Sequence, residues 1–330
     1  MELTGTGIDN ALMESYYKAI SVMRHGSVEL IDKINNHIEL TKGKQLRPVL
    51  MILSASCCGM PHDIHPNHPL FALAAAIETL HTSTLLHDDV IDESDTRRGH
   101  PSINSIWNNK TAVLMGDFYL AKVISTIFEI DNKHVTDIIC NTIVQMAEGE
   151  LLQQQCAGNP DTDKATYLEI VRKKTALLIS ASCHIGASLF TSDTTIQHAA
   201  RDFGQSIGIA FQIRDDMLDY QPTALSGKPQ GNDLKEHRPT LPLIYALQSQ
   251  DSNVRETILS LWRKPTLNDQ ETNRIIELVR QTDAFHRCSR DLRQHIAEAK
   301  QCLKNLPSNT YNDTLSALAE RISILPILNQ

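Results

Sequence analysis

The amino-acid sequence predicts an all-α fold, and three observations favour it. Apolar residues recur at spacings of three and four along most of the 330-residue chain, which is the period of an amphipathic helix. Runs of alternating β-branched residues bounded by hairpin turns are missing, so the signals for strands are scarce. No stretch rich in Pro, Gly or Ser reads as a linker, so we expect a single helical domain over residues 1–330.

The clearest expected helix covers residues 69–92, where Leu70, Leu73, Ile77 and Leu80 recur on one face. Similar patterns predict further helices over 12–39, 44–58, 111–128, 134–156, 164–190, 195–220, 239–249, 297–306 and 315–325. Glycine and proline mark the gaps between them, at 59–61, 99–101, 158–160 and 227–229. Residues 175–192 carry no Asp, Glu, Lys or Arg but many small residues, which favours a buried core helix over a membrane span.

Composition excludes several classes of protein. Hydrophobic residues make up 41% and charged residues 21%, which is typical of a globular protein. The net charge of −8 argues against a basic surface that binds nucleic acid. Seven cysteines show no spacing typical of a metal site, so we interpret them as reduced thiols. The N-terminus has early acids and no compact apolar segment, so we expect no secretory signal and a cytoplasmic location.

Two aspartate clusters dominate the chemistry of the chain, and each reads D-D-x-x-D, at residues 88–92 and 215–219. Residues four apart share a helix face, so Asp88 lies beside Asp92 and Asp215 beside Asp219. Like charges at this spacing destabilise a helix unless a cation lies between them. Magnesium is the natural cation, because a few carboxylates and substrate phosphates suffice to hold it. We therefore predict that the clusters bind one diphosphate through Mg²⁺.

An isolated D-D-x-x-D is as often a solvated helix end with local ion pairs, so its neighbours matter. Paired arginines, Arg97 and Arg98, follow the first cluster and can bind phosphate oxygens bidentately. Lys44 and Arg47 open an expected helix, whose N-terminal amides are further anion donors. His81 lies two turns before the first cluster; taken alone, it would be a hydrogen-bonded core histidine. Further polar residues accompany the second cluster: Lys174, Thr175, Gln212 and Lys228.

Taken together, these segments resemble the trans-isoprenyl diphosphate synthase family, and within it the long-chain, octaprenyl-type polyprenyl diphosphate synthases. The matching segments are GKQLRP (43–48), HTSTLLHDDVIDESDTRRG (81–99), GDF (116–118), EGELLQ (148–153), KTA (174–176), FQIRDDMLDY (211–220) and GKPQGNDLKEHRPTLPLI (227–244). The resemblance covers about residues 40–245 and, more loosely, the remainder. It implies antiparallel helices around a central cavity, a homodimer, and condensation of isopentenyl diphosphate with an allylic prenyl diphosphate.

The resemblance also implies roles for individual residues. The diphosphate of isopentenyl diphosphate would be held by Lys44, Arg47, His81 and Arg98. The allylic diphosphate or the adjacent substrate would be contacted by Arg97, Lys174, Thr175, Gln212, Lys228 and Arg238. Magnesium would be bound by Asp88, Asp92, Asp215 and Asp219, with Asp89 and Asp216 as supporting acids. The catalytic set would be Asp88, Asp92, Asp215 and Lys174.

The chain departs from the family pattern at three places. Lys42 replaces the usual second glycine, Gln45 replaces the usual arginine of the GKRxRP motif, and the late EGK tripeptide is Glu236-His237-Arg238. Gln45 removes a cation near the isopentenyl site, so we expect weaker binding there, whereas Arg238 keeps its charge. None of these changes touches an aspartate, and we expect an active enzyme.

Product length is expected to depend on the residues that precede the first cluster, because one helix turn rises about 5.4 Å, comparable to one isoprene unit. These residues are Ile77, Leu80, Ser83 and Thr84. In short-chain relatives a bulky aromatic near the last two closes the cavity, whereas Ser83 and Thr84 are small. A long product, octaprenyl by resemblance and destined for quinone side chains, is therefore predicted. Ile127 and Phe128 are candidates for the cavity floor, or for ordinary core packing.

Alternative functions remain open from the sequence. A shorter-chain synthase would share every motif. A class I terpene cyclase usually carries an N-S-E type second metal motif, which is replaced here by aspartates. A non-catalytic subunit of a heteromeric prenyl synthase would have lost aspartates or phosphate-binding cations, and both clusters are intact. A long prenyl product is very apolar, so we expect at most a transient membrane contact during product release.

Overall fold

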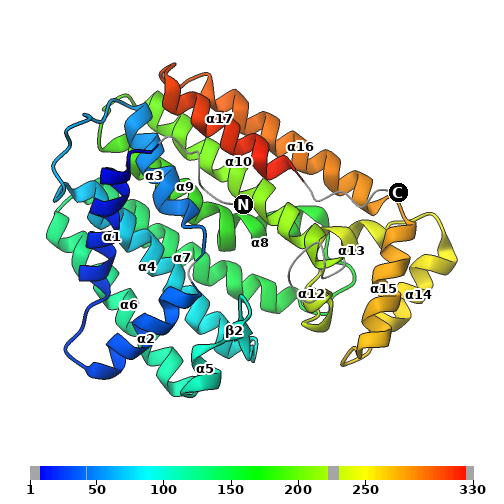
Figure 1. Cartoon of the computed structure of the whole chain (residues 1–330). Coiled ribbons are helices and arrows are strands. Elements are labelled where there is room, and N and C mark those ends of the chain that lie inside the picture. The colour runs from blue at the N-terminus through cyan, green and yellow to red at the C-terminus, as the bar shows by residue number, and fades with distance from the viewer. Residues whose placement is uncertain (1–7, 42, 222–229, 325–330) are drawn as a thin grey trace. The chain divides into compact units, whose positions relative to one another are not determined.

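The computed structural model describes residues 8–41, 43–221 and 230–324, and most of them are helical. The predicted all-α class is confirmed. Figure 1 labels the elements along the chain. The helices are α1 (Asn10–Arg24), α2 (Glu29–Leu40), α3 (Leu46–Cys57), α4 (Pro69–Ile91), α5 (Ile103–Ile106), α6 (Asn109–Ile130), α7 (Lys133–Cys156), α8 (Lys164–Val171), the π-helical η1 (Arg172–Ala176), α9 (Leu177–Ser188), α10 (Thr194–Asp219), α12 (Asn232–Lys235), α13 (Leu241–Ala246), α14 (Ser252–Trp262), α15 (Asp269–Gln281), α16 (Ala284–Leu303) and α17 (Thr310–Ser323). In the described part of the chain, the strands are β1 (Thr96–Arg97) and β2 (His100–Pro101).

The chain divides into two compact units, which we call unit 1 and unit 2. Unit 1 comprises Met1–Asn141, Leu178–Gly204 and Cys302–Ser316. Unit 2 comprises Thr142–Leu177, Gln205–Gln301 and Ala317–Gln330. The first aspartate cluster belongs to unit 1 and the second to unit 2. The single domain and central cavity expected from the sequence stay predictions.

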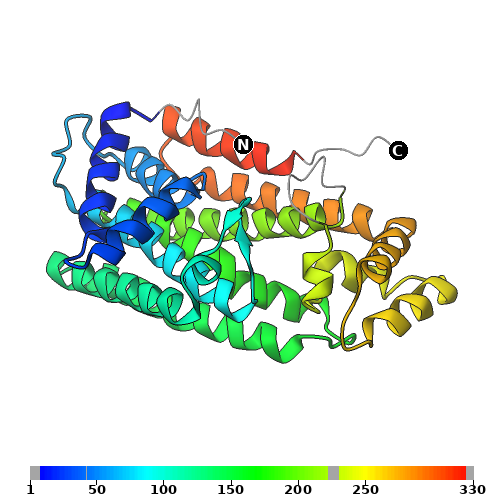
Figure 2. The ribbon, with the colours of Figure 1, turned by 60° about the horizontal axis from the view of Figure 1, so that its bottom comes forward.

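Helix α4 forms the centre of unit 1. It begins at Pro69, a residue favoured in the first turn, and the His68 ring accepts a hydrogen bond from the amide of Leu70. Small residues from Ala74 to Ala76 are fully buried, which lets neighbouring helices approach closely. Helices α1, α3 and α6 pack against it, and Figures 1 and 2 show α6 running beside α4.

The single helix expected over 12–39 is wrong, because the chain forms α1 and α2 with a break between them. His25 ends α1 with extended backbone angles. Gly26 follows, and a Cβ there would lie 2.6 Å from Ile31 Cδ1, so a larger residue would have to displace that side chain. The helices expected over 297–306 and 315–325 are the late parts of α16 and α17. Helices α5 and α12 were not predicted, and α14 and α15 lie in the region beyond about residue 250 whose pattern is helical but for which no bounds were predicted.

The uncharged segment around α9 lies in the core, as predicted. Residues from Leu178 to Ala187 are all buried. Helix α9 meets α3 within unit 1 at Gly186, where a Cβ would lie 2.2 Å from the carbonyl oxygen of Met51. The two backbones can therefore approach only because position 186 has no side chain.

Unit 2 is built around aromatic residues and contains the buried acid Asp291. Tyr220 and Trp262 are fully buried, and Asp291 is 3% exposed. The Asp291 carboxylate accepts a hydrogen bond from the Tyr245 hydroxyl and pairs with Lys164 Nζ at 2.7 Å. These contacts connect α8, α13 and α16, which matters because α8 leads directly into the site residues of η1.

Two helices in the described residues, α4 and α6, are long and apolar enough to cross a membrane by length and composition. The most apolar window of α4 is 67% buried inside the protein, whereas that of α6 is only 33% buried. Core helices pass the same test, and the burial of α4 identifies it as one. All seven cysteines are free thiols.

Gly186→Ala should destabilise the protein, because the added methyl group overlaps the Met51 carbonyl of α3. We expect the free energy of unfolding to fall by about 1–3 kcal/mol, measured by urea denaturation followed by circular dichroism. Ser188→Ala on the same helix is the control, and its effect should stay within about 0.5 kcal/mol. Equal stability of Gly186→Ala and the wild type would contradict this packing.

Candidate active site

The first aspartate cluster forms the C-terminal turn of α4. The helix ends at Ile91, and the amide of Asp92 donates to the carbonyl oxygen of Asp88 at 2.8 Å. Asp88 and Asp92 are half-buried, whereas Asp89 is 4% exposed. Carboxylates at a helix C-terminus oppose the helix dipole, so this turn favours a nearby cation.

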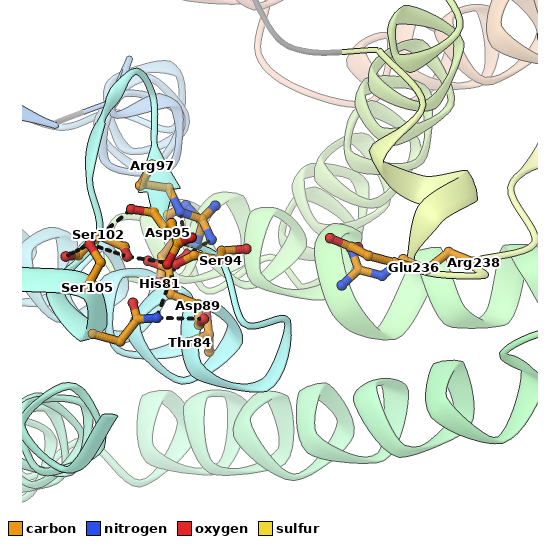
Figure 3. Close-up of polar contacts among 11 residues, drawn as sticks. His81, Thr84, Asp89, Ser94, Asp95, Arg97, Ser102, Ser105, Glu236 and Arg238 are labelled. Atoms are coloured by element: carbon orange, nitrogen blue, oxygen red, sulfur yellow. Dashed lines mark hydrogen bonds and ion pairs between the residues drawn. The ribbon is translucent and has the colours of Figure 1, made fainter. Parts of the chain in front are cut away.

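The buried acid of this cluster is paired with Arg97, as Figure 3 shows. Arg97 Nε donates to Asp89 Oδ1 at 2.9 Å, and its Nη2 donates to the same oxygen. Burial raises the pKa of the Asp89 carboxyl, and Arg97 opposes that shift. Arg97 is therefore placed against the supporting acid of the first cluster.

Arg97 reaches Asp89 because β1 and β2 turn back over the end of α4. Arg98 and Gly99 form the turn, both with positive φ (53° and 82°), which is typical of a type I′ hairpin. The Ser102 hydroxyl donates to the carbonyl oxygen of Ser94 at 2.7 Å, closing the base of the hairpin. The turn holds Arg98 where its Nη1 donates to the carbonyl oxygen of Thr41 at 2.6 Å.

A pocket in unit 1 is lined by two of the four predicted isopentenyl-site residues, His81 and Arg98. Its lining includes Gly43, Gln45, His81, Arg97 and Arg98. A Cβ on Gly43 would lie 2.6 Å from Arg98 Nη2, so the conformation of Arg98 requires glycine there. Burial and the arginines around it lower the pKa of His81 well below the usual value, so its ring is neutral at pH 7.

The N-terminus of α3 borders the same pocket. Gln45 is the N-cap residue, with a left-handed φ of 50°, and its side chain makes no capping bond. Lys44 is exposed and Arg47 is partly buried. Burial lowers the pKa of Arg47, while Glu78 opposes that shift. The structure thus brings Arg47, His81 and Arg98 into one electrostatic group, as their mutual charge effects show.

The second cluster is supported differently, by neutral donors. In unit 2, Asp216 is 3% exposed and accepts hydrogen bonds from Tyr167 Oη (2.6 Å) and Gln212 Nε2 (2.7 Å). The Gln212 side-chain oxygen in turn accepts from the Thr175 hydroxyl at 2.9 Å. Burial raises the pKa of Asp216 strongly, and Asp233 adds to the shift. Gln212 and Thr175 therefore hold the supporting acid, and Asp215 is half-buried beside it.

Asp219 is the last residue of α10, and its side chain binds the first amides of α12. Its two carboxylate oxygens accept the amides of Asn232 and Asp233, each at 3.1 Å. Burial and the neighbouring Asp233 raise the pKa of Asp219 to about 7. Asp219 thus fixes the start of α12.

Two predicted cations in the described part of unit 2, Lys174 and Arg238, form ion pairs. Lys174 lies in η1 and pairs with Glu150 at 2.5 Å. Arg238 pairs with Glu236 at 2.8 Å, as Figure 3 also shows. His237 occupies the usual glycine position of that tripeptide with a φ of 53°, and its Nε2 lies 2.8 Å from the carbonyl oxygen of Lys264. The predicted residue Lys228 and the replaced glycine position Lys42 lie outside the described residues.

The aspartates fit magnesium as pairs rather than as a closed cage. Among residues 8–41, 43–221 and 230–324, no group of three or more His, Cys, Asp or Glu side chains is arranged to hold a metal ion. Mg²⁺ is commonly held by one or two carboxylates, with water and substrate phosphates completing its shell. Asp88 with Asp92, and Asp215 with Asp219, offer that donor set, so a metal that arrives with a diphosphate is compatible with both clusters.

The predicted chain-length residues lie on two sides of α4. Ser83 is 2% exposed, and its hydroxyl donates to the carbonyl oxygen of Gly116 on α6 at 2.8 Å. Thr84 is half-buried and donates to the carbonyl oxygen of His81 in its own helix. Leu80 and Ile77 are buried. Ser83 therefore lies in the contact between α4 and α6. Of the two floor candidates, Ile127 is buried and Phe128 is 68% exposed.

Sequence reasoning missed two supporting residues. Glu78 is 8% exposed, and burial raises its pKa while Arg47, Arg24 and Arg98 oppose the shift. Its sequence signal was available, because Glu78 is the lone charged residue between Pro69 and Leu86. Tyr167, which holds Asp216, had no comparable signal, since the two are 49 residues apart.

Comparisons with known proteins agree with this site. A family model described as polyprenyl synthetase matches residues 28–279. The all-trans-nonaprenyl-diphosphate synthase (geranyl-diphosphate specific) of Rhodobacter capsulatus is 37% identical over 289 residues, or 87% of each chain. The heptaprenyl diphosphate synthase component 2 of Geobacillus stearothermophilus is 35% identical over 86% of each chain. The octaprenyl diphosphate synthase of Escherichia coli is 35% identical over 69% of this chain and 70% of its own.

A solved structure extends the likeness to the fold. The crystal structure of a polyprenyl synthase from Caulobacter crescentus, complexed with calcium and isoprenyl diphosphate, superimposes with a TM-score of 0.86 at 32% identity. The match covers 95% of this chain and 94% of that one.

Glu78 should make stability depend on pH. Its folded-state pKa is raised, so its contribution is fully present below the unfolded pKa and is lost as pH rises through the folded pKa. The free energy of unfolding of the wild type, relative to Glu78→Gln, should therefore fall as the pH rises above the ordinary glutamate pKa of about 4.3. Urea denaturation at several pH values measures this, with the exposed Glu14→Gln as control. A difference that rises with pH would show that Glu78 is stabilised as a carboxylate.

Proposed function

Because the chain belongs to the polyprenyl synthetase family, it is a trans-prenyl diphosphate synthase, and we propose that it makes a long product from farnesyl diphosphate. Successive isopentenyl diphosphates are added head to tail until an all-trans octaprenyl diphosphate is released for quinone side chains. Two D-D-x-x-D clusters, each with its own partners for the buried acid, carry this proposal. The relatives include heptaprenyl, octaprenyl and nonaprenyl synthases, so a long chain is supported as a class.

The proposed reaction breaks one bond and forms another. The C1–O bond of the allylic diphosphate breaks, and the diphosphate leaves with the bonding electrons. The alkene of isopentenyl diphosphate attacks C1, forming a C–C bond, and a proton then leaves the new carbocation. The released diphosphate accepts that proton, so no side-chain base is required. Fixed positive charge that meets the departing diphosphate lowers the barrier.

Magnesium held by the aspartate pairs would supply positive charge for the leaving diphosphate. In unit 1, Asp88 and Asp92 carry this role, and the Arg97–Asp89 pair fixes the turn that presents them. In unit 2, Asp215 and Asp219 act with Lys174 and Arg238. Lys174 must exchange its partner Glu150 for the phosphate during binding.

The diphosphate of isopentenyl diphosphate is assigned to the pocket of unit 1. Arg47 and Arg98 bind it as charged forks, and Lys44 adds a point charge from the exposed side. His81 is neutral at pH 7 and contributes one hydrogen bond. The N-terminal amides of α3 favour the same anion.

A homodimer is proposed from the exposed face of α6. Leu114 and Phe128 are 57% and 68% exposed, and Val113 and Ile124 add to the same apolar surface. A second copy of the chain would cover it. The alternative is a heteromeric enzyme, and the relative named component 2 of a heptaprenyl diphosphate synthase supports it. The assay below distinguishes the two, because it uses the purified chain without a partner. We also propose that the protein is cytoplasmic and contacts a membrane only transiently, when the product is released.

Purified protein given magnesium, farnesyl diphosphate and labelled isopentenyl diphosphate should form an elongated ladder that ends at octaprenyl. Chelation of the metal should abolish elongation, and Asp88→Asn should lower kcat by about 100-fold or more. Chromatography of the dephosphorylated products measures both effects. Asp137→Asn, on an exposed ion pair of α7, is the control. Without elongation from any allylic primer, the chain would instead be a subunit that needs a partner.

Aromatic substitutions on α4 should shorten the product. Thr84→Phe and Ser83→Phe place a ring one turn before the first cluster, so the growing chain should stop earlier. Thr84→Val and Ser83→Ala keep a small volume and should leave the product length unchanged. Product chromatography reads the length, and a thermal melt checks that Ser83→Phe folds, since Ser83 contacts Gly116 closely. Wild-type lengths from both phenylalanine variants would rule out the helical ruler.

A further inference from the structure

Arg24, at the end of α1, lines the same pocket of unit 1 as Gln45, His81 and Arg98. It comes from a segment that carries none of the recognised motifs. Only 7% of Arg24 is exposed, so its charge is directed into the protein rather than into solvent. A buried arginine is costly unless an anion compensates it, so the charges around it decide its role.

Positive charge exceeds negative charge in this part of the pocket. The buried carboxyl of Glu78 lies near three arginines, because the charges of Arg24, Arg47 and Arg98 all act to lower its pKa. Glu39 approaches Arg24 only at 3.7 Å, and half of its side chain is exposed. Nε of Arg24 and Nε of Arg47 are both buried and have no hydrogen-bond partner among the described residues. This arrangement suits a further anion with several acceptor oxygens.

Arg24 is held in place before any ligand binds. Its Nη2 donates to the Thr82 hydroxyl at 2.7 Å, and its guanidinium lies 5.4 Å from the centre of the Tyr119 ring. Asn35 Nδ2 donates to the carbonyl oxygen of Arg24 at 2.9 Å, and Tyr119 donates to Asn35 Oδ1. Thr82 follows His81 in α4, so Arg24 is fixed beside a predicted substrate contact. Little side-chain entropy remains to be lost on binding.

Gln45 is the position at which the GKRxRP pattern has a cation. It lines the pocket as an uncharged residue, at the N-cap of α3. We propose that Arg24 supplies the positive charge that Gln45 lacks, and that it binds the diphosphate of isopentenyl diphosphate. The proposal rests on the function proposed above and adds a specificity residue from outside its motifs.

Arg24→Gln should raise the dissociation constant for isopentenyl diphosphate by about 10- to 100-fold, the loss expected for a hydrogen bond between charged groups. Calorimetry without an allylic primer measures this constant without turnover. The KM for farnesyl diphosphate should stay within about twofold of the wild type. Arg24→Lys keeps the charge and should lose less affinity, and the exposed Arg274→Gln is the control for a lost surface charge.

The decisive variant is Arg24→Gln combined with Gln45→Arg, which moves the cation from α1 to the N-cap of α3. Recovery of most of the lost affinity supports the proposal. No recovery, with a lowered melting temperature or KM values raised for both substrates, would show that Arg24 only supports the fold and would overturn it.

The two proposals can fail separately. If the wild type elongates a prenyl chain while Arg24→Gln binds isopentenyl diphosphate as tightly as the wild type, the role of Arg24 is overturned and the function stands. If the wild type does not elongate but binds inorganic diphosphate in a manner that depends on Arg24, the function falls and the anion site stands. Absence of any diphosphate binding by the wild type would overturn both.

Discussion

Carboxylates at the C-terminal end of a helix are opposed by the helix dipole, and both aspartate clusters occupy such an end. The rest of the site depends on how this unfavourable charge is stabilised. In unit 1 the buried Asp89 forms an ion pair with Arg97. Arg97 lies in a hairpin whose turn contains two residues with positive φ. In unit 2 the buried Asp216 accepts hydrogen bonds from Tyr167 and Gln212. The same five-residue pattern is thus stabilised by an ion pair in one place and by neutral donors in the other.

This difference divides the two clusters chemically. Burial raises the pKa of both inner acids, but Arg97 opposes the shift at Asp89, whereas Asp233 adds to a strong shift at Asp216. The outer acids, Asp88 and Asp92 in the first cluster, remain half-exposed at the helix end. In each cluster the inner acid is held by other side chains, and the metal-binding role that we propose falls to the outer acids.

The sequence was informative wherever a pattern was local. Helix α4 was predicted almost to the residue, because its apolar period is strong and Pro69 marks its start. The break between α1 and α2 was missed, since the apolar period continues through Gly26 and hides it. Helices α14 and α15 were expected only as a helical pattern beyond about residue 250 and without bounds. Glu78 was detectable as a lone acid in an apolar helix. Arg24 was not, because its contact with Thr82 joins residues 58 apart.

The π-helical turn η1 has a consequence for how this chain can change by insertion and deletion. Here the amide of Leu177 donates to the carbonyl oxygen of Arg172, five residues back, so the turn holds one residue more than an α-helix would. Loss of one of its residues would restore regular α-helical geometry without displacing the helix on either side, because a π-helical turn accommodates an extra residue locally. The side chains that the turn presents would change, and Lys174 and Thr175 are among them. Ala176, at the end of the turn, lies against Gly208, where the two backbones nearly touch, so this contact requires glycine at position 208.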